Sequence, residues 1–466
     1  MKIIAAFALG MLGTVNAYPV QNDPDPDGFV HTASTEYTPP DDPAVLQALD
    51  QWQDLKFGIF FHWGLYSVEG ISESWPLCSE EKFTPRRQNI LPGCDYEGFK
   101  RWYWGQAEKF NPVNFNPQAW AAMMRDAGTK YMVFTTKHHD GFCMFDTEFS
   151  DFKVTAGPFA HDANANITKA LFDAFRNEGF KIGAYFSKAD WHDQYYWSRQ
   201  LATPTRGVNY DIDKHPGWWA QFKKNTAGQI KELMSDYGRV DILWLDGGWV
   251  RAPKEDINID SIVDMARSLQ PGLIAVDRTV HGRNENYTTP EMRVPDRQLP
   301  YPWETNTTIT NRWGWTPRPK YKSERQLVNL LAEVVAKGGN LLLDVGPRPD
   351  GTIEEQARTR LAYIGRWLDK NGESIYNTRP TEVYNSGNIW FTASKDGKTI
   401  YAIYALPDGE NLPAKISWHG NIPSGKITLL STGRKISHTT DADGLTTVRL
   451  PDNLPQEAIA LKFRIK

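Results

Sequence analysis

Predicted strands and helices alternate from about residue 56 to residue 370, and this alternation limits the fold more than any other feature. Short apolar runs such as Ile242 to Leu245 are typical of strands buried on both faces, and helical segments separate them. Such a pattern predicts parallel strands with helices packed outside them. We count six or seven strands and predict an α/β fold. Residues 41–375 are expected to form a (β/α)8-like barrel that is irregular or incomplete.

The pattern changes from about Thr378 onward. Short segments of alternating polar and apolar residues follow one another, and D-G and G-N turns separate them. Six short strands of this kind predict a β-sandwich over residues 378–466. This part has no cluster of carboxylates, so we expect it to be structural. Trp390 and Trp418 offer the alternative of a sugar-binding face.

The first 40 residues have the composition of an exported protein. Residues 1–17 contain a lysine, an apolar stretch and a small-x-Ala site, which together predict a cleaved signal peptide. Residues 18–40 are rich in Pro, Asp and Thr and are expected to be a linker. We therefore predict a periplasmic or secreted protein, or a lysosomal or extracellular one if the source is eukaryotic. No other apolar run approaches the length of a membrane span.

Charge and cysteine content restrict the partners and cofactors. The sequence has 52 Lys and Arg against 56 Asp and Glu, a net charge of −4, which disfavours a nucleic-acid-binding protein. Cys78 and Cys94 are candidates for one disulfide, and Cys143 lies in an apolar context typical of a buried thiol. No cysteine spacing matches a metal site.

Asp246 is the strongest single candidate for chemistry. It directly follows the apolar run that ends at Leu245, and Gly247 and Gly248 come next. A carboxylate at the C-terminal tip of a buried strand lies where barrel enzymes have their active sites. The alternative is a turn or helix-capping aspartate, because D-G is a common turn sequence.

Other polar side chains follow the predicted strands in the same way: His62, His138, His139, Tyr185 and Arg278. Each has a structural alternative, and the adjacent His138 and His139 could be read as a metal pair. Neighbouring residues of an extended segment point to opposite faces, however, and no H-E-x-x-H spacing occurs, so we expect no metal. Together these groups favour a site that holds a sugar through hydrogen bonds and aromatic faces.

Four segments resemble the retaining α-L-fucosidases of glycoside hydrolase family 29. They are F-G-I-F-F-H-W-G from Phe57, Y-M-V-F-T-T-K-H-H-D-G-F from Tyr131, L-W-L-D-G from Leu243 and G-G-N-L-L-L-D-V-G-P from Gly338. The resemblance spans nearly the whole predicted barrel. It implies a barrel followed by a β-sandwich and an enzyme that needs no cofactor.

The resemblance also implies roles for individual residues. Asp246 would be the nucleophile. The fucose-binding residues would be His62, Glu73, Trp75, His138, His139, Tyr185, Trp244 and Arg278. Trp75 would lie near the C5 methyl group of the sugar. Glu73 is separated from Trp75 by Ser74, whereas the family commonly has an adjacent Glu-Trp pair, so this assignment departs from the family pattern.

Glu291 and Glu304 are both candidates for the general acid/base. Both are expected in the polar stretch between Arg278 and Ser323. The apolar residues before Glu304 would raise its pKa by desolvation, whereas position within the family favours Glu291. We predict Glu291 as the acid/base and Glu304 as a supporting residue.

The sequence therefore predicts an exported, exo-acting α-L-fucosidase that works by retaining double displacement on fucosylated oligosaccharides or glycoconjugates. The alternatives are another retaining exo-glycosidase of similar barrel type and a glycan-binding protein without catalytic activity.

Overall fold

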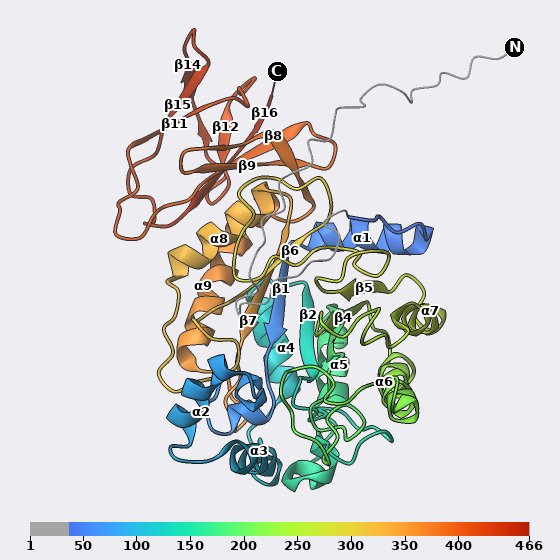
Figure 1. Cartoon of the computed structure of the whole chain (residues 1–466). Coiled ribbons are helices and arrows are strands. Elements are labelled where there is room, and N and C mark those ends of the chain that lie inside the picture. Colours follow the sequence, from blue (N-terminus) through green and yellow to red (C-terminus); the bar gives the residue numbers. More distant parts are fainter. Residues whose placement is uncertain (1–36, 466) are drawn as a thin grey trace, which may run out of the picture.

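The computed structural model describes residues 37–465 and contains a barrel-like part followed by two antiparallel sheets (Figure 1). Seven parallel strands form the first sheet, in the order β5-β4-β3-β2-β1-β7-β6. Their bounds are β1 Phe57–Phe61, β2 Tyr131–Lys137, β3 Lys181–Ser187, β4 Ile242–Asp246, β5 Ile274–Asp277, β6 Glu304–Thr308 and β7 Asn340–Val345. The predicted α/β fold with an irregular barrel is confirmed.

Helices cover the outer side of this sheet, and most strands lead into one of them (Figure 1). The helices are α1 Pro43–Leu55, α2 Thr84–Ile90, α3 Tyr96–Trp104, α4 Pro117–Asp126, α5 Ile167–Asn177, α6 Pro216–Ser235, α7 Ile259–Leu269, α8 Glu324–Ala336 and α9 Glu355–Asn371. Helix α8 begins with a capping box in which Ser323 and Gln326 each bond the other's backbone N–H. Its apolar stripe, including Leu327 and Leu331, is buried against the barrel core.

The sheet is not closed by an eighth regular strand, because β5 and β6 lie at its two edges. An irregular segment, residues 284–292, lies between them. Its Asn286 N–H donates to the carbonyl of Ala275 on the β5 side. On the β6 side, the N–H of Met292 donates to the carbonyl of Asn306. This segment therefore satisfies backbone groups on both edges of the opening.

Strand β6 lies inside a stretch that the sequence predicted as a loop. Its sequence, E-T-N-T-T, contains no apolar residue, although all five residues are buried. Apolar runs, on which the prediction relied, therefore missed it. The β-branched threonines favour a strand, and the first residue, Glu304, belongs to the sheet rather than to a loop.

The C-terminal strands form a six-stranded sheet and a three-stranded sheet, both antiparallel. Their bounds are β8 Thr378–Ser386, β9 Ile389–Ser394, β10 Thr399–Tyr404, β11 Lys415–His419, β12 Ile427–Leu429, β13 Lys435–Ile436, β14 His438–Thr440, β15 Leu445–Arg449 and β16 Ile459–Arg464. Side chains from both sheets, such as Phe391 and Trp418, share one apolar core. The expected sandwich therefore packs as a unit of its own, next to α8.

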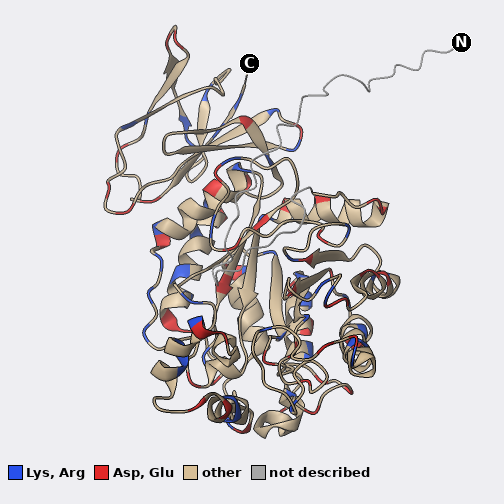
Figure 2. Ribbon diagram, in the orientation of Figure 1, with Lys and Arg blue, Asp and Glu red and all other residues tan. Residues whose placement is uncertain are grey.

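The predicted signal peptide, residues 1–17, and most of the 18–40 linker lie outside the described residues. Among residues 37–465, no helix is long and apolar enough to cross a membrane. The three cysteines are free thiols, so the Cys78–Cys94 bridge is not formed. Acidic and basic side chains are interspersed over the molecule, and Figure 2 shows no large region of one sign.

Trp390 and Trp418 show why we expect the C-terminal sheets to be structural. Trp418 is buried in the core that the two sheets share, and Trp390 lies beneath the ammonium group of Lys337, which follows α8. Neither ring forms an open aromatic face. All residues that line the main pocket precede residue 314.

We predict that Trp390→Ala destabilises the protein without changing sugar binding. Removing a half-buried indole should cost roughly 1–3 kcal/mol, because packing against the barrel is lost. Thermal unfolding should shift to lower temperature, while KM for a fucosylated oligosaccharide stays within about twofold, a change of under 0.5 kcal/mol. A large rise in KM in the folded variant would show that this region binds glycans.

Candidate active site

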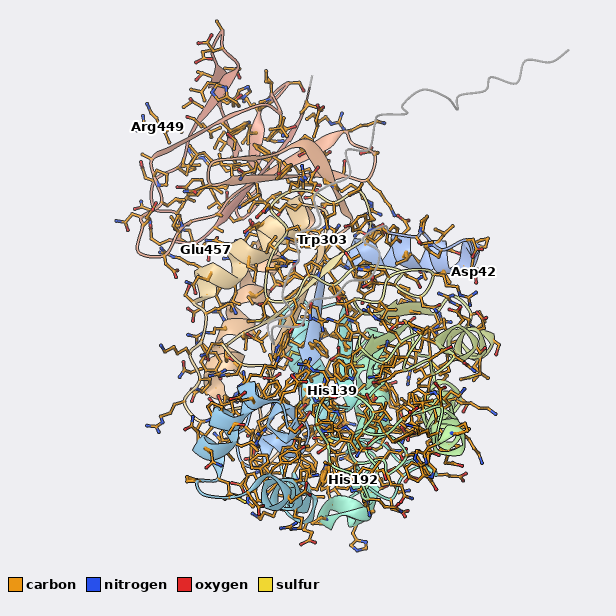
Figure 3. All side chains as sticks on the ribbon, viewed as in Figure 1. Asp42, His139, His192, Trp303, Arg449 and Glu457 are labelled. Atoms are coloured by element: carbon orange, nitrogen blue, oxygen red, sulfur yellow. The ribbon has the colours of Figure 1, made fainter. Side chains whose placement is uncertain are left out.

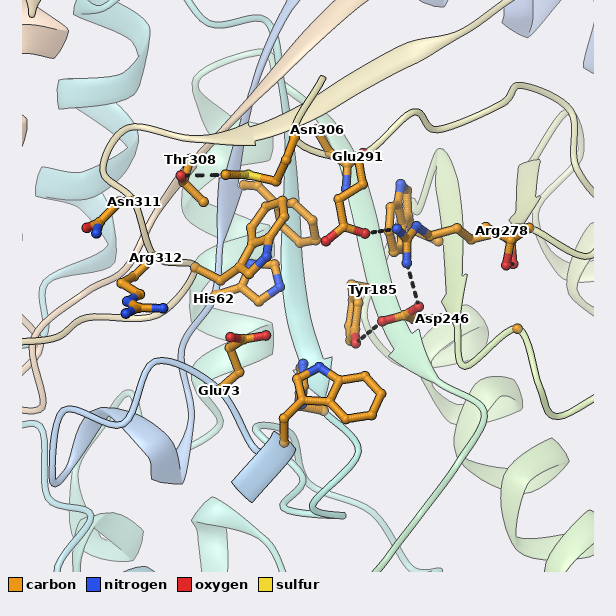
Figure 4. Close-up of a pocket in the computed structure, with 18 of the residues that line it drawn as sticks. His62, Glu73, Tyr185, Asp246, Arg278, Glu291, Asn306, Thr308, Asn311 and Arg312 are labelled. Atoms are coloured by element: carbon orange, nitrogen blue, oxygen red, sulfur yellow. Dashed lines mark hydrogen bonds and ion pairs between the residues drawn. The ribbon is translucent and has the colours of Figure 1, made fainter. Parts of the chain in front are cut away.

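A pocket lies at the C-terminal ends of the barrel strands, where the loops meet. It encloses about 990 Å³, its open mouth included. The residues that line it are Phe60, His62, Glu73, Trp75, Arg86, His138, Tyr185, Trp244, Asp246, Gly248, Trp249, Arg278, Thr279, Glu291, Met292, Asn306, Thr308, Asn311, Arg312 and Trp313. Figure 4 shows how the charged groups among them face the same space.

Asp246 is the last residue of β4, as predicted, and three groups hold its carboxylate. The Tyr185 hydroxyl donates to Oδ2 over 2.7 Å, and Nη1 of Arg278 lies 3.3 Å from Oδ1. Nε2 of His139 lies 3.6 Å from Oδ2. Burial would raise the pKa of Asp246, but the positive charge of Arg278 and these neighbours hold it well below the usual range. The carboxylate of Asp246 is therefore ionised at neutral pH.

Three histidines surround the pocket or lie directly behind it, and a different partner holds Nδ1 of each. His62 Nδ1 lies 2.7 Å from a carboxylate oxygen of Asp344. His138 Nδ1 lies 2.5 Å from the Ser74 hydroxyl. His139 Nδ1 lies 2.6 Å from a serine hydroxyl at the end of β3, Ser187. Fixing one ring nitrogen leaves Nε2 of His62 and His138 for the pocket, whereas Nε2 of His139 faces Asp246.

Burial keeps the first two histidines neutral. The pKa of His62 and that of His138 are both lowered to about 3, because the charged ring would lose its hydration. A neutral imidazole ring can donate a hydrogen bond to a sugar hydroxyl or accept one from it. His139 contacts both Asp246 and the ring of Trp75. Figure 3 places His139 near the middle of the barrel-like part of the molecule. Among residues 37–465, no three His, Cys, Asp or Glu side chains are grouped to hold a metal ion.

Arg278 contacts two carboxylates. Besides Asp246, its guanidinium forms an ion pair with Glu291, which lies on the irregular segment between β5 and β6. A single side chain thus brings the two carboxyl groups to one side of the pocket (Figure 4). The guanidinium also lies over the ring of Trp244, 5.7 Å from its centroid.

Glu304 is not at the pocket surface. It is fully buried inside the barrel, where it accepts hydrogen bonds from the Tyr131 hydroxyl, at 2.7 Å, and from the Trp244 indole, at 3.3 Å. Burial raises the pKa of Glu304 to about 7. Trp244 lines the pocket and its ring stacks on Tyr185, so Glu304 is connected to the site through this ring.

The loop after β1 supplies Glu73 and Trp75. Trp75 is nearly buried and packs edge-on to His139, with ring centroids 5.0 Å apart. A second indole, Trp249 from the loop after Asp246, lies 5.7 Å from it. The carboxylate of Glu73 points into the pocket in Figure 4. These aromatic and carboxylate groups offer an apolar patch beside hydrogen-bond acceptors.

The structure therefore brings together all the predicted site residues except Glu304, which lies below the pocket, and His139, which lies behind it. Sequence reasoning missed the partners that orient the histidines, Asp344, Ser74 and Ser187. Asp344 follows the apolar run L-L-L of residues 341–343, much as Asp246 follows the apolar run of β4. The wall formed by Asn311, Arg312 and Trp313 had no such pattern.

A carboxylate kept ionised, a second carboxyl beside it, neutral histidines and indole rings in one pocket define a glycoside-hydrolase type of site. The model of the family described as "Alpha-L-fucosidase" matches residues 28–373. The chain therefore belongs to the α-L-fucosidase family and is a glycoside hydrolase.

Individual α-L-fucosidases are similar to this protein over nearly the whole chain. Tissue α-L-fucosidase of Homo sapiens is 28% identical over 457 residues, covering 92% of this chain and 90% of the relative. α-L-Fucosidase isoenzyme 1 from Paenibacillus thiaminolyticus is 28% identical with a TM-score of 0.75, covering 91% and 100% of the two chains. The α-fucosidase of Thermotoga maritima is 27% identical with a TM-score of 0.71, covering 92% and 100%. It has been solved with fucose and with a mechanism-based inhibitor.

We predict that Arg278→Gln moves the acidic limb of the pH profile. Without the cation, the ionised form of Asp246 is less stable, so its pKa rises and activity is lost at a higher pH on the acidic side. kcat/KM at neutral pH should fall by roughly 10- to 100-fold, as when one preorganised electrostatic group is removed.

The measurement is kcat/KM for an aryl α-L-fucoside from pH 3 to 9. Arg239→Gln is the matched control, because this arginine pairs with Asp241, at the other end of β4 from Asp246. If the acidic limb of Arg278→Gln coincides with that of the wild type, Arg278 does not set the ionisation of Asp246.

Proposed function

We propose that this α-L-fucosidase removes a terminal α-L-fucosyl unit by double displacement, with Asp246 as nucleophile and Glu291 as general acid/base. The observation that carries the proposal is the guanidinium of Arg278, which contacts both carboxylates at once. In a retaining glycosidase the two carboxyl groups lie about 5–5.5 Å apart, on either side of the bond that breaks. A shared cation between them supports this short separation.

In the first step, a carboxylate oxygen of Asp246 attacks the anomeric carbon while Glu291 gives its proton to the leaving oxygen. The bond to the leaving group breaks and a glycosyl ester forms. In the second step Glu291, now ionised, takes a proton from water, and the water oxygen displaces Asp246. The Tyr185 hydroxyl donates a hydrogen bond to Asp246. This bond would weaken when the carboxylate becomes an ester and strengthen again when the carboxylate is released.

The neutral rings of His62 and His138 would bind the sugar hydroxyls, together with Glu73. The indoles of Trp75 and Trp249 would face the C5 methyl group, since an apolar group gains by leaving water for an aromatic surface. These residues come from the segments after β1, β2 and β4 and surround one pocket, which favours exo-action on one terminal sugar. The residues of the predicted signal, 1–17, support export of the enzyme.

We predict that Asp246→Gly folds but loses nearly all hydrolysis. The loss should exceed about 1,000-fold, because the variant lacks the oxygen that attacks the anomeric carbon. Added azide should occupy the space left by the carboxylate and give a β-fucosyl azide. Circular dichroism checks the fold and NMR identifies the product. Near-wild-type turnover in this variant would exclude Asp246 as the nucleophile.

We predict different effects for the two glutamates. Glu291→Ala should slow fucosides with poor leaving groups far more than an activated aryl fucoside, because only the former need a proton to depart. Azide should rescue it with retained α configuration, since azide then attacks the β-linked intermediate.

Glu304→Ala should instead slow both substrates by a similar factor, because Trp244 loses its buried acceptor. Glu304→Gln is the matched control, as its side-chain oxygen still accepts from the indole. If Glu304→Ala shows the leaving-group dependence and azide rescue, and Glu291→Ala does not, the two roles exchange.

A further inference from the structure

The pocket has a second charged wall, on the side away from the nucleophile. From Asp246, the Tyr185 hydroxyl lies 2.7 Å away, and the ring of Tyr185 lies 5.9 Å from that of His62. The ring of His62 is in turn 4.9 Å from that of Trp313. Arg312 precedes this tryptophan and lines the same pocket. Figure 4 shows Arg312 and Asp246 on opposite sides of the pocket, so the breaking bond and Arg312 are at opposite ends.

Hydrogen bonds fix the backbone of this wall, whereas the guanidinium of Arg312 contacts no acidic group among residues 37–465. The Thr310 hydroxyl donates to the carbonyl of Arg312 and accepts from its N–H, at 2.9 and 3.0 Å. The side-chain oxygen of Asn311 accepts from the N–H of Lys320, so the turn is tied to the following loop. Within residues 37–465, the guanidinium of Arg312 has no hydrogen bond or ion pair, and in Figure 4 it points toward the cavity.

A second arginine lines the pocket beside Glu73, which Figure 4 shows on the same side as Arg312. Arg86 comes from α2 and its closest acidic partner is Glu73, with the charged atoms 4.0 Å apart. Its side chain is 45% exposed, so this pair is loose and water reaches it. Arg86 is therefore partly available to a bound group that carries negative charge.

The charges of the pocket do not balance in the state that starts the reaction. Glu73, Asp246 and Glu291 face the three guanidinium groups of Arg86, Arg278 and Arg312. When Glu291 carries the proton that it delivers, one positive charge is in excess. Arg278 is taken by Asp246 and Glu73 lies near Arg86, so the excess is at Arg312. An unsubstituted fucose is neutral and offers it no counter-charge.

We infer that the end of the pocket at Arg312 and Arg86 is a subsite for an anionic ester on the fucosyl unit itself, and that sulfated α-L-fucosides are substrates. This inference rests on the proposed function. With the anomeric carbon at Asp246, the opposite side of the sugar ring, which carries the 3- and 4-oxygens, faces this wall.

Sulfate esters suit these residues. A sulfate monoester stays anionic throughout the pH range of the enzyme, and its oxygens match the fork of donors on a guanidinium. Asn311 adds an amide at the same wall. Arg312 and Asn311 are both exposed, so a group larger than a hydroxyl can reach this wall from solvent.

The test compares wild type and Arg312→Gln on 4-nitrophenyl α-L-fucoside and on its 3-O-sulfate and 4-O-sulfate esters. A further substrate carries unsubstituted fucose on a sulfated leaving-group sugar. Arg318→Gln is the matched control, since it removes the same charge from the same loop but does not line the pocket. Each kcat/KM is measured at low and high NaCl.

We expect the wild type to hydrolyse at least one sulfated fucoside with a kcat/KM no lower than that of the neutral one. Arg312→Gln should lower kcat/KM for that ester by about tenfold or more, as expected for one charge-assisted hydrogen bond. The neutral fucoside should change by less than about threefold, within the effect of a weak surface charge. NaCl should weaken only the sulfated substrate, because salt screens the ion contact.

The inference is wrong if the neutral fucoside is hydrolysed and neither sulfate ester is. It is also wrong if Arg312→Gln affects neutral and sulfated fucosides equally, or if only the sulfated leaving group depends on Arg312. Failure of the wild type on the neutral fucoside would instead contradict the proposed function.

Discussion

The site depends on keeping one largely buried carboxylate charged. Removing Asp246 from water disfavours its ionised form, and a nucleophile must be ionised to attack. The structure meets this requirement with the guanidinium of Arg278, the hydroxyl of Tyr185 and the ring of His139. These three groups come from the ends of β5, β3 and β2, and Asp246 comes from the end of β4. The barrel therefore has to position the ends of four strands correctly relative to one another.

Supporting groups behind these contacts fix them in turn. Tyr185 stacks on Trp244, whose indole N–H is held by Glu304 within the barrel. Arg278 follows Asp277, which forms a buried ion pair with Lys188 across the strand end of Asp246. Buried charges of this kind are costly unless paired, so their presence beneath the pocket is consistent with a positioning role. The opening of the sheet between β5 and β6 also helps to form the site, because the irregular segment that lies in it carries Glu291.

Much of this could be predicted from the sequence, because apolar runs locate strands and the residue after a run is at the strand tip. His62, His138, Tyr185, Asp246 and Arg278 were found in this way. Strand β6 was missed because its buried residues are polar, and this placed Glu304 in a loop. The partners Ser74 and Ser187 carry no pattern of their own, since only the folded chain brings them to the histidine rings.

The most direct test of the account is to label the nucleophile. Incubation of the enzyme with 2-fluoro-fucosyl fluoride should leave a 2-fluorofucosyl ester, since the fluorine at C2 slows both steps whereas the good fluoride leaving group still allows the ester to form. Intact-protein mass spectrometry should show one added sugar, and peptide mapping should place it on Asp246. A label on Glu291 or Glu304, or inactivation with no covalent sugar, would contradict Asp246 as the nucleophile.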